Sequence, residues 1–132
     1  MTPRISLLLE AVSIPILAEH LPLQITGHSE PEQGLRRLRQ WHSGPLVVTL
    51  GKRGAAMLDG DRYIHVPAFP VRVVDSTGAG DVFRGAFIHA LLRGDPPEEV
   101  LRFANAAAAV SCTKDGAMES TPTLEEVERM LR

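Results

Sequence analysis

The apolar run from Leu46 to Leu50 constrains the fold more than any other segment of the chain. It reads Leu-Val-Val-Thr-Leu, and Gly44-Pro45 and Gly51 bound it on either side. A short β-branched run without polar alternation predicts a strand buried on both faces. Because such a strand needs helices on each face of its sheet, the flanking sequence should supply them.

Helices and strands are predicted to alternate around this run. The predicted helices cover residues 3–12, about 30–42, 81–93, about 96–114 and 124–132, and the predicted strands cover 14–17, 46–50, 55–58, 62–66 and 71–74. Ser29, Asp95 and Thr123 are predicted as helix N-caps because a glutamate follows each of them three residues later. The alternation predicts an α/β fold with three α/β/α layers and a mostly parallel sheet.

The composition limits which cellular compartment and which classes of binding partner are expected for the chain. The chain has 132 residues, of which 44% are hydrophobic, and a net charge of −2, which argues against disorder and gives no basic surface for nucleic acid. Its apolar runs are shorter than a membrane span, and no signal-peptide core follows the first residues. A single cysteine, Cys112, fits a reducing compartment. We therefore expect a cytoplasmic protein that binds neither nucleic acid nor membrane.

The loop from Asp75 to Asp81 carries the strongest chemical signal. Gly78 and Gly80 remove side chains where backbone must approach a ligand, and the loop leads directly into a predicted helix. The N–H groups of Gly78, Ala79, Gly80 and Asp81 can then point together at an anion. A carboxylate beside a phosphate suits a general base for an attacking hydroxyl. The alternative is an ordinary tight turn in which Asp81 only caps the helix.

Four segments resemble the ribokinase-like (PfkB) carbohydrate kinases in order and spacing. They are residues 47–54 (VVTLGKRG), 75–87 (DSTGAGDVFRGAF), 103–109 (FANAAAA) and 116–122 (GAMESTP). The match runs from about residue 46 to the end of the chain. It implies that residues 1–132 form a single partial domain, ribokinase-like but incomplete, corresponding to the C-terminal half of such a kinase.

The resemblance implies a role for each matching position. Asp81 would be the catalytic base, and the amides of Gly78, Ala79 and Gly80 would form an anion hole for the γ-phosphoryl group of ATP. Thr49, Gly51 and Gly54 would line the nucleotide, and Asn105 would lie beside the adenine. ATP would bind with Mg²⁺, and many members hold K⁺ next to the anion hole. The positions matching the K⁺ ligands are Asp75, Thr77, Ser111, Lys114, Gly116 and Ser120.

Two features depart from the family pattern. The Asn-x-x-Glu pair that helps organise magnesium and phosphate has no counterpart near residues 17–20, where Glu19 is the only carboxylate. Glu19 is therefore either part of the site or a solvated turn residue. Lys52 and Arg53 lie in the predicted phosphate loop, where either one could contact phosphate or face solvent. The half that grips the sugar in family members also has no match here.

Two functions remain open on the sequence. The first is phosphoryl transfer from ATP to a sugar or nucleoside hydroxyl, with this chain supplying the nucleotide site and the base. The second is a non-catalytic fragment that binds nucleotide or self-assembles. Because the acceptor half is unmatched, an uncovered sheet edge and apolar face should remain. We therefore expect either a homo-oligomer or a complementing N-terminal half.

Overall fold

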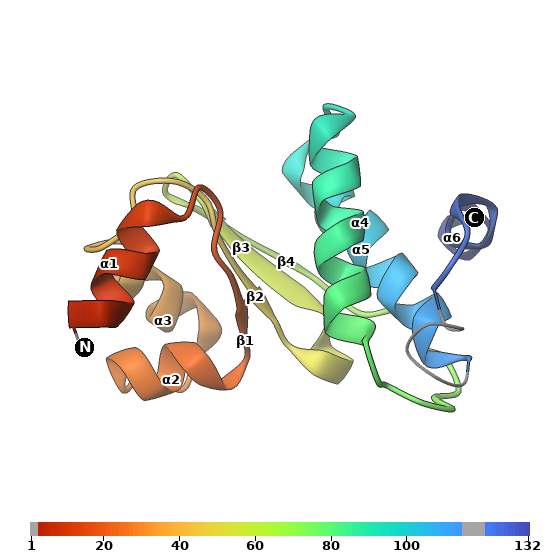
Figure 1. The fold of residues 1–132 in the computed structure, drawn as a ribbon, viewed down its shortest axis with the longest axis horizontal. Helices are drawn as coiled ribbons and strands as arrows, with labels where there is room; N and C mark the ends of the chain where they lie inside the picture. The colour runs from red at the N-terminus through yellow and green to blue at the C-terminus, as the bar shows by residue number, and fades with distance from the viewer. Residues whose placement is uncertain (1–2, 115–120) are drawn as a thin grey trace. The chain divides into compact units, whose positions relative to one another are not determined.

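The chain forms two compact units in a computed structural model that describes residues 3–114 and 121–132 (Figure 1). The first unit contains Met1–Gly51 and Ala55–His65, and the second contains Lys52–Gly54 and Val66–Arg132. In these described residues, no helix is both long enough and apolar enough to span a bilayer.

A four-stranded sheet with the order β1-β2-β3-β4 organises the first part of the fold. Its strands are β1 (Ile16–Ala18), β2 (Leu46–Thr49), β3 (Ala55–Asp59) and β4 (Arg62–Val66). Strand β1 runs parallel to β2, whereas β3 runs antiparallel to β2. The sheet is therefore mixed, and the prediction of a mostly parallel sheet is wrong for the described residues. The hairpin predicted at Asp59-Gly60-Asp61 is confirmed and supplies the antiparallel strands.

Three helices of the first unit lie together on one side of its strands (Figure 1). They are α1 (Pro3–Ala11), α2 (His20–Thr26) and α3 (Pro31–Leu38). Leu9 of α1 and the fully buried Leu35 and Leu38 of α3 join a core with Leu46 and Val48 of β2. Leu46 and Val48 face this core, and Val47 between them is also fully buried, so β2 is apolar on both of its faces.

Prolines shift two of the predicted boundaries in the first unit. Helix α3 has Glu30 at its N-cap and Pro31 at its first position, so the predicted Ser29 cap is wrong. The fixed φ of proline suits the first helical position, which lies one residue later than the sequence pattern indicated. The strand predicted over residues 14–17 begins only after Pro15, at Ile16. The carbonyl of Pro15 accepts a hydrogen bond from Val47 N at 3.0 Å.

The second unit is helical and is built on α4 (Ala79–Leu92), α5 (Pro97–Cys112) and α6 (Leu124–Leu131). Phe83 and Phe87 of α4 are buried, with ring centroids 6.2 Å apart. Helix α5 offers them an alanine-rich surface, because Ala104, Ala106 and Ala107 are almost fully buried. Small side chains allow the two helices to approach closely, so α5 is a packing element of the unit.

Two predictions fail in the second unit. Residues 71–74 form no strand; Val74 is 61% exposed, and its N–H donates to Cys112 O at 2.7 Å. The carbonyl of Cys112 at the end of α5 thus accepts the Val74 N–H group that would otherwise bond a neighbouring strand. The N-cap of α5 is Pro96, not Asp95, whose carboxylate instead bonds the Arg93 guanidinium at 2.6 Å.

The predicted cap at Thr123 is confirmed and leads to a pH prediction. Glu126 Oε1 accepts from Lys114 Nζ at 2.7 Å and from Thr123 N at 3.0 Å, and these bonds lower the pKa of Glu126 from its usual 4.5 to about 2. A lowered carboxyl pKa stabilises the fold fully above pH 4.5, and this contribution is lost as the pH falls from 4.5 to about 2. Urea unfolding at several pH values should show this loss in the wild type and a weaker pH dependence in Glu126→Gln. Equal slopes for the two proteins would contradict the assignment.

Candidate active site

The loop before α4 is folded on itself and tied to the end of α5. Asp75 Oδ1 accepts hydrogen bonds from Thr77 N at 2.9 Å and from Thr77 Oγ1 at 2.6 Å. Asp75 N donates to Cys112 O at 3.2 Å. These bonds hold the loop before α4 and place the side chains of Asp75 and Thr77 in contact.

The first turn of α4 offers main-chain donors. Gly78 is the N-cap, and its φ of 80° lies in the left-handed region that favours glycine. The hydrogen bond from Val82 N to Gly78 O, 3.0 Å long, closes the first turn, so Gly80 and Asp81 have N–H groups with no acceptor four residues back. Ala79 N already donates to Ser76 O at 3.2 Å. The three predicted amides are therefore not equivalent.

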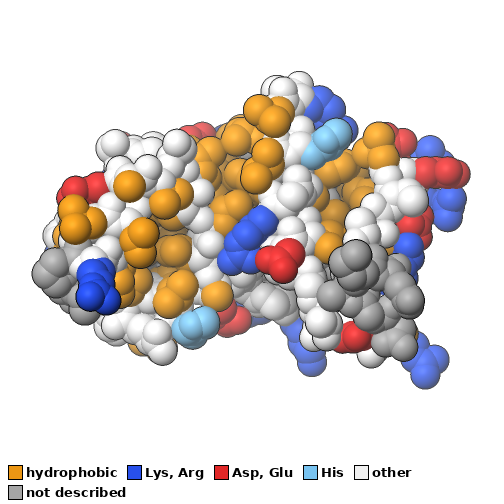
Figure 2. All heavy atoms as spheres, in the orientation of Figure 1, with side chains coloured by type: hydrophobic (Ala, Val, Ile, Leu, Met, Phe, Trp, Pro, Cys, Tyr) orange, Lys and Arg blue, Asp and Glu red, His pale blue; other side chains and the backbone are white. Residues whose placement is uncertain are grey.

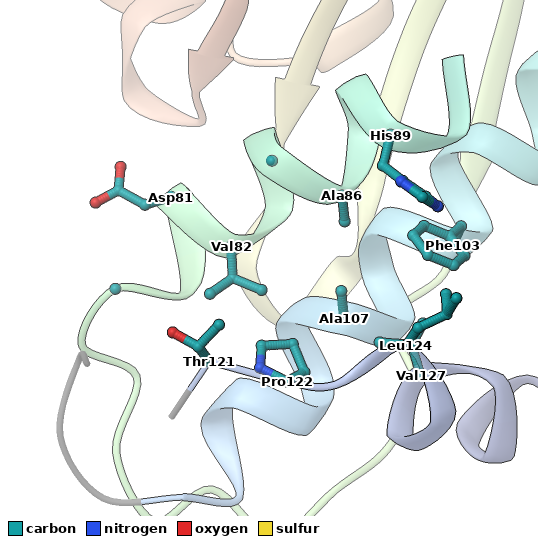
Figure 3. A pocket seen from close by; sticks show the side chains of 12 residues that line it. Asp81, Val82, Ala86, His89, Phe103, Ala107, Thr121, Pro122, Leu124 and Val127 are labelled. Atoms are coloured by element: carbon teal, nitrogen blue, oxygen red, sulfur yellow. The ribbon is translucent and has the colours of Figure 1, made fainter. Parts of the chain in front are cut away.

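Asp81 stands exposed in this first turn. No hydrogen bond joins its carboxylate to another residue that the structure describes, and Figure 3 shows the carboxylate turned outward at the rim of a pocket. That pocket has a volume of about 550 Å³. It is lined by Gly78, Asp81, Val82, Gly85, Ala86, His89, Phe103, Ala107, Thr121, Pro122, Leu124 and Val127. Most of the lining residues are apolar. Asp81 carries the one carboxylate among the lining residues that the structure describes. Spacing in the sequence did not indicate the pocket, because its lining comes from three helices and from residues just before two of them.

The other predicted nucleotide residues of the first unit gather at the ends of two strands. Thr49 ends β2, and its Oγ1 donates to Leu17 O at 3.4 Å. Gly51 follows with a φ of 57°, and a Cβ at this position would lie 3.9 Å from Glu19 Oε2. Glu19, Thr49 and Gly51 thus come together at the carboxyl ends of the parallel pair β1 and β2. Ligands of α/β sheets bind at such ends.

Gly54 and Asn105 have a structural connection that the sequence did not reveal. A Cβ on Gly54, whose φ is 96°, would lie 2.1 Å from Val66 O, so only glycine fits there. Asn105 is 5% exposed, and its Nδ2 donates to Val66 O at 3.0 Å and to Pro67 O at 3.3 Å. Asn105 therefore holds residues 66–67 against Gly54. A buried asparagine within an alanine-rich helix was the available signal for this contact.

The predicted K⁺ ligands lie only partly in the described chain. Asp75 and Thr77 meet, and Ser111 is fully buried one residue before the Cys112 carbonyl that binds Asp75 N. Burial, together with the charge of Asp75, raises the pKa of Cys112. Lys114 directs its ammonium group to Glu126. Gly116 and Ser120 lie outside the described residues. Across residues 3–114 and 121–132, no three His, Cys, Asp or Glu side chains gather to hold a metal ion.

The sequence matches known proteins over most of its length. The profile of the family described as pfkB family carbohydrate kinase matches residues 1–124. Ribokinase of Bacillus subtilis is 42% identical over 101 residues, which are 76% of this chain and 34% of that protein. Fructokinase-1 of Oryza sativa is 40% identical over 94 residues, covering 65% of this chain and 29% of that protein.

Solved structures of ribokinases are also similar to this chain. Arabidopsis thaliana ribokinase complexed with ribose and ATP has a TM-score of 0.89 at 33% identity, over 96% of this chain and 43% of that chain. The putative ribokinase II of E. coli in complex with ATP and Mg²⁺ has a TM-score of 0.86 at 33% identity, over 96% and 41%. The chain thus spans about a third of the length of its sequence relatives and under half of these solved chains.

Proposed function

The chain belongs to the pfkB family of carbohydrate kinases, and we propose that it forms the nucleotide-binding part of an ATP-dependent phosphotransferase. The acceptor would be a hydroxyl of a sugar or nucleoside. The observation that carries this proposal is the position of Asp81, whose exposed carboxylate stands in the first turn of α4 beside unpaired helix N–H groups. A base and an anion site next to each other are what phosphoryl transfer requires.

In the proposed reaction, Asp81 accepts the proton of the acceptor hydroxyl as its oxygen attacks the γ-phosphorus. The bond between that phosphorus and the β,γ-bridging oxygen breaks, and ADP leaves with the bonding electrons. The N–H groups of Gly80 and Asp81, with the positive end of the α4 dipole, stabilise the charge on the transferred group. The predicted anion hole also includes Gly78 and Ala79, and Ala79 would contribute if its bond to Ser76 opened. General bases of this kind contribute about 10²–10⁴-fold in rate.

The proposed nucleotide contacts fall into two sets. Thr49 and Gly51, with Glu19 beside them, would bind phosphate and ribose at the carboxyl end of β2. Gly54 would contribute backbone, and Asn105 would position residues 66–67 beside the adenine through its two hydrogen bonds.

Each unit, taken by itself, has oxygen donors that fit cations which accompany a nucleotide. The Glu19 carboxylate is a hard oxygen donor of the kind that Mg²⁺ prefers, and Asp75 and Thr77 offer oxygens suited to K⁺. These cations would neutralise phosphate charge when bound. The residues themselves hold the loop in place, because Asp75 bonds both Thr77 and the Cys112 carbonyl.

A second candidate is a non-catalytic fragment that binds nucleotide or self-assembles. The matched region covers 34% of Bacillus subtilis ribokinase, and the residues that grip the sugar in family members have no match within residues 1–132. Phosphoryl transfer depends on positioning both substrates. We therefore expect little phosphorylation of a sugar by residues 1–132 alone. The cytoplasm stays the predicted compartment.

Calorimetric titration with ATP-Mg²⁺ tests the proposal, using two variants of the same helix. Gly80→Val should weaken binding at least tenfold, because its side chain would stand where the phosphate approaches the open N–H groups. The added Cβ would meet only the end of Arg84, 3.1 Å away, so the fold should tolerate it. Gly85→Val is the matched control, since a Cβ there meets no atom within 4 Å. No measurable affinity in the wild type would refute the proposal for this chain.

A further inference from the structure

Both ring nitrogens of His42 face main-chain carbonyls in the first unit. His42 lies between α3 and β2 and is only 8% exposed. Its Nδ1 lies 2.7 Å from Leu9 O, and its Nε2 lies 3.1 Å from Ser13 O. A carbonyl oxygen only accepts hydrogen bonds, so each of these contacts needs a proton on the nitrogen. Neutral imidazole has one N–H group and imidazolium has two, so only the cation makes both bonds.

The end of α1 favours a positive charge at this position. Helix α1 ends at Ala11, so Leu9 O is one of its last four carbonyls, which have no N–H partner within the helix. The negative end of the helix dipole lies there and attracts a cation. Gly44 leaves room for the second bond, because a Cβ at this position would lie 3.1 Å from His42 Nε2 and 3.2 Å from Ser13 O.

Two other charged side chains line a cavity of about 520 Å³ beside His42. Glu10 is exposed on α1, and its negative charge favours the imidazolium form. The positive charge of Arg39 opposes it. The Arg39 guanidinium bonds main-chain carbonyls, because Nη1 donates to His42 O at 2.9 Å and to Gly44 O, and Nη2 donates to Gly60 O at 3.0 Å. Arg39 therefore holds the backbone of residues 42–44 in place, which keeps the ring between its two carbonyls.

Helix α1 has few other buried contacts. Leu9 is the one buried residue among residues 4–11, whereas Leu7 is 64% exposed and Leu8 is 63% exposed. Figure 2 shows hydrophobic side chains on the viewed face over α1. A segment with few buried apolar contacts opens locally more readily than the rest of a fold. Loss of one of the two His42 bonds should therefore let α1 open more often.

We propose that His42 is a pH-sensitive clasp, which holds the end of α1 and the residue Ser13 when its ring carries two protons. Histidine is the side chain whose charge ordinarily changes between about pH 5 and 8. The second bond forms only with the second proton, so the clasp is closed at the acidic end of this range. The stability that it gives to α1 is lost as the pH rises through the range. This inference does not depend on the proposed nucleotide site.

The ring protons of the wild-type chain test the clasp directly. In a long-range nitrogen–proton NMR spectrum of the ¹⁵N-labelled chain at about pH 6, both ring N–H protons of His42 should be visible, because a hydrogen bond holds each of them. The ring protons of His28, which is exposed in the same unit, should exchange with water too fast to be seen. A His42 ring with a single proton at this pH would overturn the proposal.

Hydrogen exchange tests the consequence for α1. Between about pH 6 and pH 8, the protection of the α1 amides, corrected for the intrinsic effect of pH on exchange, should fall roughly fivefold, the effect of losing one hydrogen bond. His42→Gln should show low protection that does not change with pH, and His28→Gln, the matched control, should behave as the wild type does. The same pH dependence in His42→Gln as in the wild type would overturn the clasp, and so would its loss in His28→Gln.

Discussion

Asp81→Asn should reduce ATP turnover at least 100-fold while leaving ATP-Mg²⁺ affinity equal to or tighter than that of the wild type. Asparagine keeps the shape of the side chain but cannot accept the proton of the attacking hydroxyl, so the contribution of a general base is lost. The same change removes a negative charge next to the bound phosphates, which are themselves negative, so it removes an electrostatic repulsion. ADP release, measured with ATP-Mg²⁺ in the absence and presence of sugar and nucleoside acceptors, gives the rate. Calorimetry gives the affinity.

The opposite directions of these two effects separate catalysis from helix capping. If Asp81 only stabilised the start of α4, the variant would lower the urea midpoint and leave any turnover in proportion to the folded fraction. Gly78 is the N-cap of α4, and no described residue bonds the Asp81 carboxylate, so we expect the midpoint to change little. Asp61→Asn, at the exposed tip of the β3–β4 hairpin, is the matched control for removing one carboxylate.

Local sequence signals predicted most of the elements. The ribokinase-like α/β class is confirmed by solved structures with TM-scores of 0.86 and 0.89. The apolar run at 46–50 gave β2, Asp59-Gly60-Asp61 gave the hairpin, and Thr123 gave the start of α6. Each of these depends on a few neighbouring residues, so the pattern carries the information. The strand predicted at 71–74 failed because a strand depends on a distant partner, and the end of α5 takes the Val74 N–H instead.

The candidate site also has features that local sequence predicts and features that depend on contacts between distant residues. The open N–H groups at the start of α4 could be predicted, because the first turn of any helix has N–H groups without a helical acceptor. The roles of Asp81 and of the glycines before it stay predictions. The bond between Ala79 N and Ser76 O was not predictable, since it depends on the torsion angles within the loop. Nor was the contact between Gly54 and residues 66–68, which lie far along the chain. The family resemblance implied that Gly54 lines the nucleotide, and the structure adds a packing requirement at the same position.

Gly54→Ala should destabilise the second unit by several kcal/mol. The alanine Cβ would lie 2.1 Å from Val66 O, 2.6 Å from Ala68 N and 2.7 Å from Pro67 C, all of them backbone atoms. Asn105 holds the carbonyls of Val66 and Pro67, so this segment cannot move away without breaking buried hydrogen bonds. Overpacking of this kind costs about 1–3 kcal/mol, and a strained dihedral adds about 1–3 kcal/mol. The sum is a large part of the roughly 5–15 kcal/mol that stabilises a typical domain.

Gly60→Ala separates the two causes, because Gly60 has a φ of 60° but no atom within 4 Å of the added Cβ. It should incur only the dihedral cost, about 1–2 kcal/mol, in urea unfolding. The double variant Gly54→Ala with Asn105→Ala should lose less than the sum of the single losses, because residues 66–67 would then be free to shift. Equal losses for Gly54→Ala and Gly60→Ala would show that the backbone contact relaxes at little cost.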